Sequence, residues 1–144
     1  KKGVLYTYSQ KGRFTEKIVY EHFDKIENDP IDLAGDNCHS PCDGICPNGM
    51  SYEVKSSGLL KEREGWQFYV GGKYKIRINI YYFLAFNRNW TKLEYSWRVP
   101  GDMVEKANFY VGMFGGRFNV GNMIEYEITD ILDNILREYG FFDE

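Results

Sequence analysis

Apolar side chains recur at helical spacing in two segments, one near each end of the chain. The first is residues 14–27, where Thr15 is the predicted N-cap and Glu16 falls in the first turn, on the stripe expected to face inward. The second is residues 124–139, which predicts an amphipathic helix packed on a sheet. The apolar positions of the first segment are Ile18, Val19, Phe23 and Ile26.

Three segments between these helices have the patterns of β-strands. Residues 66–70 alternate between apolar and polar side chains. Residues 76–86 form a long apolar run, which is typical of a strand buried on both faces, and residues 93–99 are predicted to return antiparallel to it. We therefore expect an α/β fold with a mixed central β-sheet flanked by helices, in a single domain spanning residues 1–144.

A β-hairpin is predicted just before these strands. Residues 42–46 form one short strand, Pro47-Asn48-Gly49 has the chemistry of a turn, and residues 50–55 form the returning strand. The central sheet is expected to be built on this hairpin.

The register of the hairpin brings charged side chains together. If Cys46 and Met50 close the turn, Asp43 lies directly opposite Glu53. Opposed residues of an antiparallel pair have Cβ atoms roughly 4.5–5.5 Å apart, and like charges at that separation destabilise the pair. Lys55 follows two residues later on the same face. Two facing carboxylates beside a cation therefore predict a divalent-cation site.

This arrangement resembles the active-site pattern of the PD-(D/E)xK nucleases, the restriction-endonuclease-like superfamily. The pattern is an Asp, a short hairpin and then Glu-x-Lys, present here as Asp43 and Glu53-Val54-Lys55, with Cys42 in place of the usual Pro. The likeness covers roughly residues 12–100, as the order of a helix with an early Glu, the hairpin and an apolar strand. It implies a restriction-endonuclease-like fold and a metal-dependent nuclease that hydrolyses DNA phosphodiesters.

The resemblance also implies a role for each residue of the pattern. Asp43, Glu53 and the backbone carbonyl of Val54 would bind Mg²⁺ (or Mn²⁺), which prefers oxygen ligands. Lys55 would orient or deprotonate the attacking water, or stabilise the transition state. The structural alternative is a surface hairpin with a cross-strand Glu–Lys pair and an ordinary turn Asp.

Two further site residues are suggested by the same resemblance. In the family, a Glu at the place of Glu16 often joins the metal site, and some relatives carry a catalytic-site Gln at the place of Gln67. The alternative for Glu16 is a favourable interaction with the helix dipole.

The cysteine and histidine side chains of residues 38–46 form a second pattern, which invites a zinc or iron–sulfur interpretation. In the predicted hairpin, Cys42 and Cys46 are separated by four residues of strand, or roughly 13 Å, too far to share one tetrahedral ion. Buried thiols are the better account, and an odd count of three cysteines argues against a disulfide framework and favours a reducing interior. The residues of this pattern are Cys38, His39, Cys42 and Cys46.

Charge is unevenly distributed along the chain. The net charge is −3, yet residues 55–98 hold nine basic side chains against three acidic ones, and residues 120–144 hold seven acids against one base. A basic middle beside an acidic tail is typical of a phosphate-facing surface, although a set of solvated loop charges is the open alternative. The predicted nucleic-acid contacts are Lys61, Arg63, Lys73, Lys75 and Arg77.

Together these features predict a Mg-dependent endodeoxyribonuclease of the restriction, homing or junction-resolving type. The choice of DNA over RNA follows from the family resemblance, and the acidic net charge counts against a junction resolvase. A homodimer is expected because a duplex offers two strands to cut. An intracellular location, cytoplasmic or nucleoid-associated, is also expected. The sequence contains no run of about 18 apolar residues, so it does not predict a membrane span. The alternatives are a non-catalytic nucleic-acid- or protein-binding domain with a nuclease-like fold and a zinc-binding structural domain.

Overall fold

The computed structural model describes residues 8–22, 44–45, 51–70, 78–104 and 108–142. Along these segments, five strands follow one another between the first helix and the first 3₁₀ helix. In chain order they are α1 (Tyr8–Glu21), β1 (Gly44–Ile45), β2 (Ser51–Gly58), β3 (Gly65–Tyr69), β4 (Ile80–Phe86), β5 (Leu93–Pro100), the 3₁₀ helix η1 (Gly101–Met103), β6 (Asn108–Gly112), the 3₁₀ helix η2 (Ile124–Tyr126) and α3 (Thr129–Glu138).

The central sheet has four described strands in the order β1-β2-β4-β5. The β1–β2 and β4–β5 pairs are antiparallel, whereas β2 and β4 run parallel, so the sheet is mixed as predicted. A second, two-stranded sheet pairs β3 with β6 in antiparallel fashion. This second sheet was not predicted, because β6 (residues 108–112) falls largely in the glycine-rich segment 109–123, which has no clear strand pattern.

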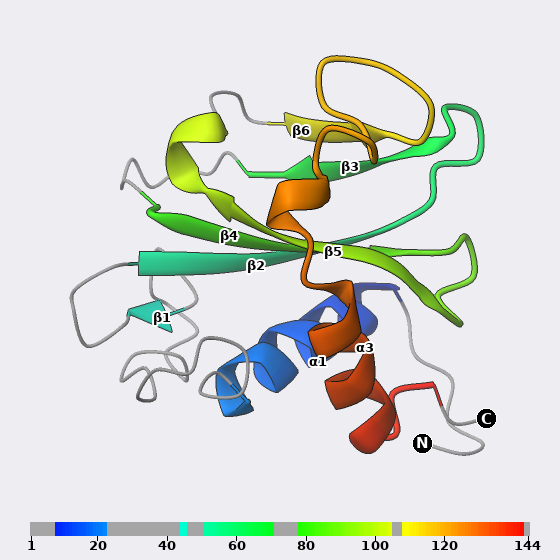
Figure 1. Cartoon of the computed structure of the whole chain (residues 1–144). Coiled ribbons are helices and arrows are strands. Elements are labelled where there is room, and N and C mark those ends of the chain that lie inside the picture. The colour runs from blue at the N-terminus through cyan, green and yellow to red at the C-terminus, as the bar shows by residue number, and fades with distance from the viewer. Residues whose placement is uncertain (1–7, 23–43, 46–50, 71–77, 105–107, 143–144) are drawn as a thin grey trace.

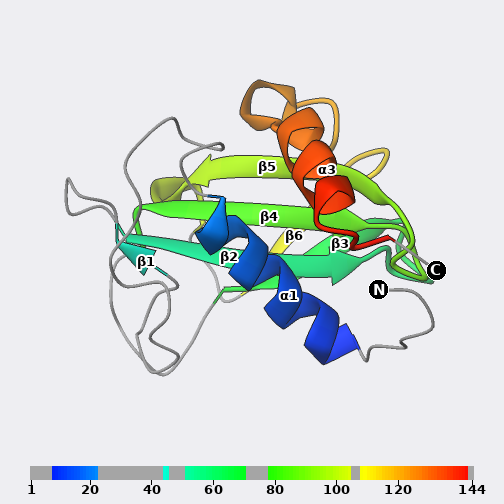
Figure 2. The same cartoon turned by 90° about the horizontal axis from the view of Figure 1, so that it is seen from below.

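The elements form three layers (Figure 1). The β3–β6 sheet covers one face of the central sheet, and α1 and α3 lie against the other face. Seen from the helical side, α1 crosses β2 while α3 lies beside β5 (Figure 2). One apolar core therefore lies between the helices and the central sheet, and a second core lies between the two sheets.

Strand β4 is the centre of the molecule. All seven of its residues are buried, which confirms the prediction of a strand covered on both faces. Tyr82 and Leu84 belong to the core under the helices, whereas Tyr81 and Phe83 belong to the core under β3–β6. The prediction began this strand at residue 76, but β4 begins at Ile80.

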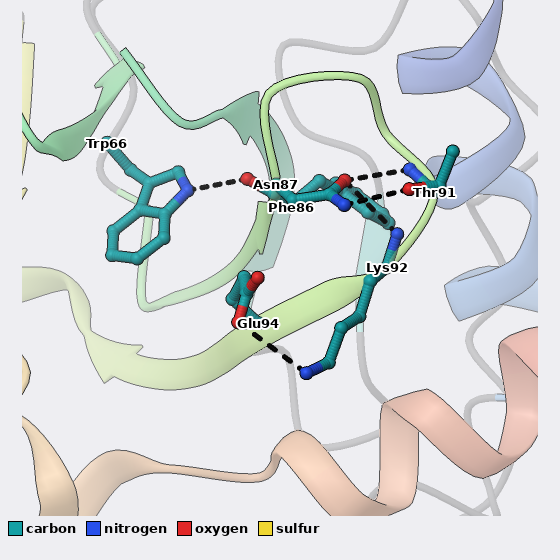
Figure 3. A network of polar contacts seen from close by, with 6 residues as sticks. All are labelled: Trp66, Phe86, Asn87, Thr91, Lys92 and Glu94. Atoms are coloured by element: carbon teal, nitrogen blue, oxygen red, sulfur yellow. Dashed lines mark hydrogen bonds and ion pairs between the residues drawn. The ribbon is translucent and has the colours of Figure 1, made fainter. Parts of the chain in front are cut away.

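The two sheets are joined by a buried hydrogen bond. The indole nitrogen of Trp66 in β3 donates to the carbonyl oxygen of Phe86 at the end of β4, over 2.8 Å (Figure 3). The turn that follows is closed by the Asn87 side chain, whose Oδ1 accepts from the backbone N–H groups of Thr91 and Lys92. These bonds hold the β4–β5 hairpin in the antiparallel pairing that the sequence predicted.

The helix boundaries correct two expectations. Helix α1 begins at Tyr8, so Thr15 is a fully buried residue in mid-helix and the predicted N-cap is wrong. Its hydroxyl donates to the carbonyl of Gly12 at 2.7 Å, which is why Thr is accommodated inside the helix. The helix expected over residues 124–139 is split into η2 and α3, since Glu127 between them is extended and bridges to Trp97 of β5.

Candidate active site

Strand β2 places the three residues of the Glu-x-Lys pattern on two faces of the central sheet. Val54 is 2% exposed and belongs to the core under the helices. Side chains alternate along a strand, so Glu53 and Lys55 point to the opposite face, the one that β3–β6 partly covers. Across the parallel β2–β4 pair, Glu53 lies beside Tyr81 and Lys55 beside Phe83, both of which belong to the core on that face.

Glu53 and Lys55 form an ion pair on this face. Lys55 Nζ lies 3.2 Å from Glu53 Oε2, with the lysine side chain 33% exposed and the glutamate side chain 17% exposed. Partial burial weakens solvent screening, so each charge stabilises the other more than at a fully exposed position. Both side chains still reach solvent, which leaves the pair accessible to a ligand. The structure thus brings together two of the predicted catalytic residues.

The β1–β2 pairing has the register that the sequence predicted. Gly44 pairs with Tyr52 and Ile45 with Ser51, in antiparallel fashion. This is the register from which Asp43 was expected opposite Glu53. Asp43 itself lies outside the described residues, and its place opposite Glu53 stays a prediction.

Two polar side chains anchor the start of β2 to the start of β4. Asn79 Oδ1 accepts from the backbone N–H of Ser51 at 2.9 Å and from the Ser51 hydroxyl at 3.3 Å. The Asn79 backbone N–H donates in turn to the Ser51 carbonyl oxygen at 3.1 Å. Because Ser51 is two residues before Glu53, these bonds determine which residue of β4 lies beside the glutamate.

That residue is Tyr81, whose ring is stacked on Phe83 with centroids 5.5 Å apart. Burial raises the pKa of the Tyr81 phenol, and the negative charge of Glu53 raises it further. The phenol is therefore neutral at physiological pH, and it is a hydrogen-bond donor beside the ion pair. Tyr81 is not among the residues predicted from the sequence, because nothing local to β2 or β4 indicates that the two strands pair in this register.

Gln67 lies elsewhere. In β3, Trp66 and Phe68 take the inner face and pack in the core between the sheets, so Gln67 points outward. There its Oε1 accepts from Arg63 Nη1 at 3.3 Å, and the Arg63 guanidinium lies 4.3 Å from the centre of the Tyr110 ring. The structure does not bring Gln67 to the ion pair, contrary to its expected place in the catalytic site.

Glu16 is half-buried on α1, in the layer on the other side of the central sheet. A place in the same site would require its side chain to reach past the edge of β2, and that role stays a prediction. Of the basic residues predicted to contact nucleic acid, Lys61 and Arg63 are exposed in the turn between β2 and β3.

The remaining candidates cannot be placed, because they lie outside the described residues. Within the described part of the chain, no group of three or more His, Cys, Asp or Glu side chains could hold a metal ion. A metal site built on three such side chains would therefore need at least one of them from outside these segments. The candidates concerned are Asp43, Lys73, Lys75, Arg77, Cys38, His39, Cys42 and Cys46.

Comparison with known proteins supports the fold. No protein-family model matches the sequence, and no curated protein matches it. Among solved structures, the chain is similar to a bacterial homing endonuclease, I-Ssp6803I, with a TM-score of 0.54 and 10% sequence identity. The match covers 95% of this chain and 99% of that chain. At this identity the likeness concerns the fold, and it agrees with the predicted mixed α/β, endonuclease-like architecture.

The length and apolarity of the described helices can be compared with what a membrane span needs. None of them is long and apolar enough to cross a bilayer.

Proposed function

We propose that the chain is a metal-dependent nuclease that hydrolyses DNA phosphodiester bonds as an endonuclease. The observation that carries the proposal is the ion pair of Glu53 with Lys55 on β2, next to a β1 strand in the predicted register. A Glu-x-Lys pair would otherwise be a common feature of a strand surface. Here it occurs in a domain whose fold is similar to that of a homing endonuclease.

The residue types at this face suit Mg²⁺ or Mn²⁺. Mg²⁺ prefers oxygen ligands, needs few carboxylates and keeps several of its waters. Glu53 supplies one carboxylate, and we propose that Asp43 supplies the second and the Val54 carbonyl a third ligand. A bound ion would supply Lewis-acid polarisation of the phosphate and a lowered pKa of a bound water.

The protein groups would carry the remaining roles. Glu53 would hold the ion at one point of the face. The Lys55 ammonium would orient or deprotonate the attacking water, or offset the negative charge that develops on the phosphate. In the absence of metal, Lys55 offsets the charge of Glu53, as their 3.2 Å contact indicates.

We propose DNA as the substrate and a homodimer as the active form. The fold similarity to a homing endonuclease supports a nucleic-acid substrate. Lys61 and Arg63 offer exposed cations in the turn that follows β2. A dimer suits a duplex because each protomer can address one strand. An intracellular location follows from such a substrate.

Cleavage assays test the proposal directly. We expect the wild-type protein to cut supercoiled, linear or branched DNA with Mg²⁺ or Mn²⁺, and to cut none of them with EDTA. Glu53→Gln and Lys55→Met should each lower the cleavage rate by at least about 100-fold, because each removes a group that acts on the developing charge. Both substitutions preserve side-chain volume, so the packing around β2 is retained and the loss of thermal stability should be limited to that of one partly exposed ion pair.

The chain offers a matched control pair. Lys92 and Glu94 have the same two-residue spacing at the start of β5, with Nζ and Oε1 4.0 Å apart (Figure 3). Lys92→Met and Glu94→Gln should therefore leave cleavage unchanged. Absence of cutting by the wild type on every DNA substrate would contradict the proposal, as would equal rates in the Glu53 and Glu94 variants.

A further inference from the structure

Tyr81 completes a row of side chains across the catalytic face of the central sheet. Glu53 of β2 pairs with Tyr81 of β4, which in turn pairs with Val99 of β5. The next row on the same face is Lys55, Phe83 and Trp97. Neighbouring residues in register point to the same side of a sheet, so the Tyr81 phenol and the Glu53 carboxylate share one face.

The ring of Tyr81 is held rigidly. It is 7% exposed and lies nearly parallel to Phe83, at 10° between ring planes. Phe83 is itself stacked on Phe109 of the second sheet, with centroids 5.0 Å apart, and packs against Phe68 at 4.5 Å. This aromatic stack leaves the phenol little rotational freedom, so its hydroxyl is preorganised for a ligand.

The hydroxyl is not used within the described structure. Within the described segments the Tyr81 hydroxyl makes no hydrogen bond, and the residue keeps 7% of its surface exposed. This hydroxyl can therefore bind a ligand atom at low cost, because no bond to a described residue has to be broken.

We propose that the Tyr81 hydroxyl donates a hydrogen bond to a non-bridging phosphate oxygen of the nucleic acid held at Glu53 and Lys55. This inference rests on the proposed nuclease function. Phosphate is the expected acceptor because the Lys55 ammonium on the same face attracts an anionic group. A fixed donor aimed at a phosphate stabilises the charge that grows on its oxygens during phosphoryl transfer.

Tyr81→Phe tests the inference, because it removes the hydroxyl and keeps the ring and its stacking on Phe83. We expect the single-turnover cleavage rate at saturating DNA to fall at least tenfold. Removal of one hydrogen-bond donor to the transition state of an enzyme typically lowers the rate by roughly 100-fold or more. The dissociation constant for duplex DNA, measured by fluorescence anisotropy with Ca²⁺, should rise by about threefold to tenfold. The thermal midpoint should stay within about two degrees of the wild type, since the packing is retained.

Tyr95→Phe is the matched control. Tyr95 is a partly buried tyrosine of the same core, stacked on Trp97 at 5.5 Å, and it lies on β5 beside Ala85. The Tyr95→Phe substitution should change neither the cleavage rate nor the dissociation constant for DNA.

The outcomes separate this inference from the proposed function. If the wild type cuts and Tyr81→Phe cuts equally well, the Tyr81 inference is wrong and the nuclease proposal stands. If the wild type binds DNA and cuts no substrate, the nuclease proposal is wrong, and an unchanged dissociation constant in Tyr81→Phe then overturns the inference as well. A protein that neither binds nor cuts DNA overturns both. A loss of rate matched by an equal loss of folded protein also overturns the inference.

Discussion

Two buried tryptophans show how the environment of a single polar atom differs within one core. Trp66 and Trp97 are both fully buried, with ring centroids 6.1 Å apart. The Trp66 indole nitrogen donates to the Phe86 carbonyl, whereas the Trp97 indole nitrogen has no acceptor among the described residues. A buried donor without an acceptor loses its hydrogen bonds to water and forms no protein hydrogen bond that offsets this cost. The two side chains therefore contribute differently to stability although their burial is the same.

Phe substitutions should reveal this difference. We expect Trp66→Phe to lower the free energy of unfolding by about 1–2 kcal/mol more than Trp97→Phe does, because only the former loses a hydrogen bond that is made. Both changes remove similar volume, so the cavity contribution is matched. Urea unfolding of the two variants measures the difference. A Trp97→Phe variant as unstable as Trp66→Phe, or less stable, would contradict the expectation.

At the scale of elements, α1 is attached to β2 by a polar contact as well as by apolar packing. The hydroxyls of Thr15 and Ser56 lie 2.6 Å apart, on the face of β2 that also carries Val54. Ile18 and Val19 of α1 pack beside this contact and are fully buried. The contact fixes how far α1 can slide along the strand that carries Glu53 and Lys55.

A double-mutant cycle tests the coupling between these elements. Thr15→Val and Ser56→Ala should each destabilise the protein by roughly 1 kcal/mol, since each leaves the other hydroxyl with one partner fewer. The double variant should cost less than the sum, by about 0.5–1.5 kcal/mol. Chemical denaturation supplies all four free energies.

Ser57 provides the control for this cycle. It neighbours Ser56 but points to the other face of β2, where its hydroxyl donates to the Gly58 carbonyl at 3.0 Å. Thr15→Val and Ser57→Ala should therefore be additive. Additivity in the Thr15–Ser56 cycle would show that the contact does not couple α1 to β2.

Elements were predicted well where the pattern is local. The strands at β3, β4 and β5 and the hairpin register follow from period-two alternation and turn residues, which act over a few positions. The start of α1 was placed too late because Thr15-Glu16 has the composition of a helix N-terminus. The structure instead places Thr15 in mid-helix, fully buried and in contact with Ser56 of β2.

At the scale of the whole molecule, the question is how an acidic chain would bind a polyanion. The net charge is −3, so binding must depend on local cations and not on overall attraction. Lys61 and Arg63 are exposed beside the β3–β6 sheet, on the side of the central sheet that carries Glu53 and Lys55. Arg13 and Lys17 are exposed on α1, in the helical layer on the other side.

Salt dependence distinguishes these two sides. For Lys61→Gln/Arg63→Gln we expect the slope of log affinity against log salt to decrease in magnitude by about 1–2, because each lost phosphate contact releases roughly one counterion fewer. Arg13→Gln/Lys17→Gln removes the same charge and should leave the slope unchanged. Binding titrations over a range of salt concentrations give both slopes. A larger effect from the α1 variant would place the nucleic acid on the helical side.

The sequence by itself determined the local geometry of the candidate site. Alternation along β2 and the turn chemistry of the hairpin put Glu53 and Lys55 on one face and set the pairing of Gly44 with Tyr52. These features are local, since strand period and turn type act between residues close in the chain. Only the tertiary structure decided which distant residues join them. The parallel pairing of β2 with β4 brings Tyr81 to Glu53, and the covering sheet turns Gln67 outward. Such contacts depend on burying both faces of β4 at once, which no short segment of the sequence can specify.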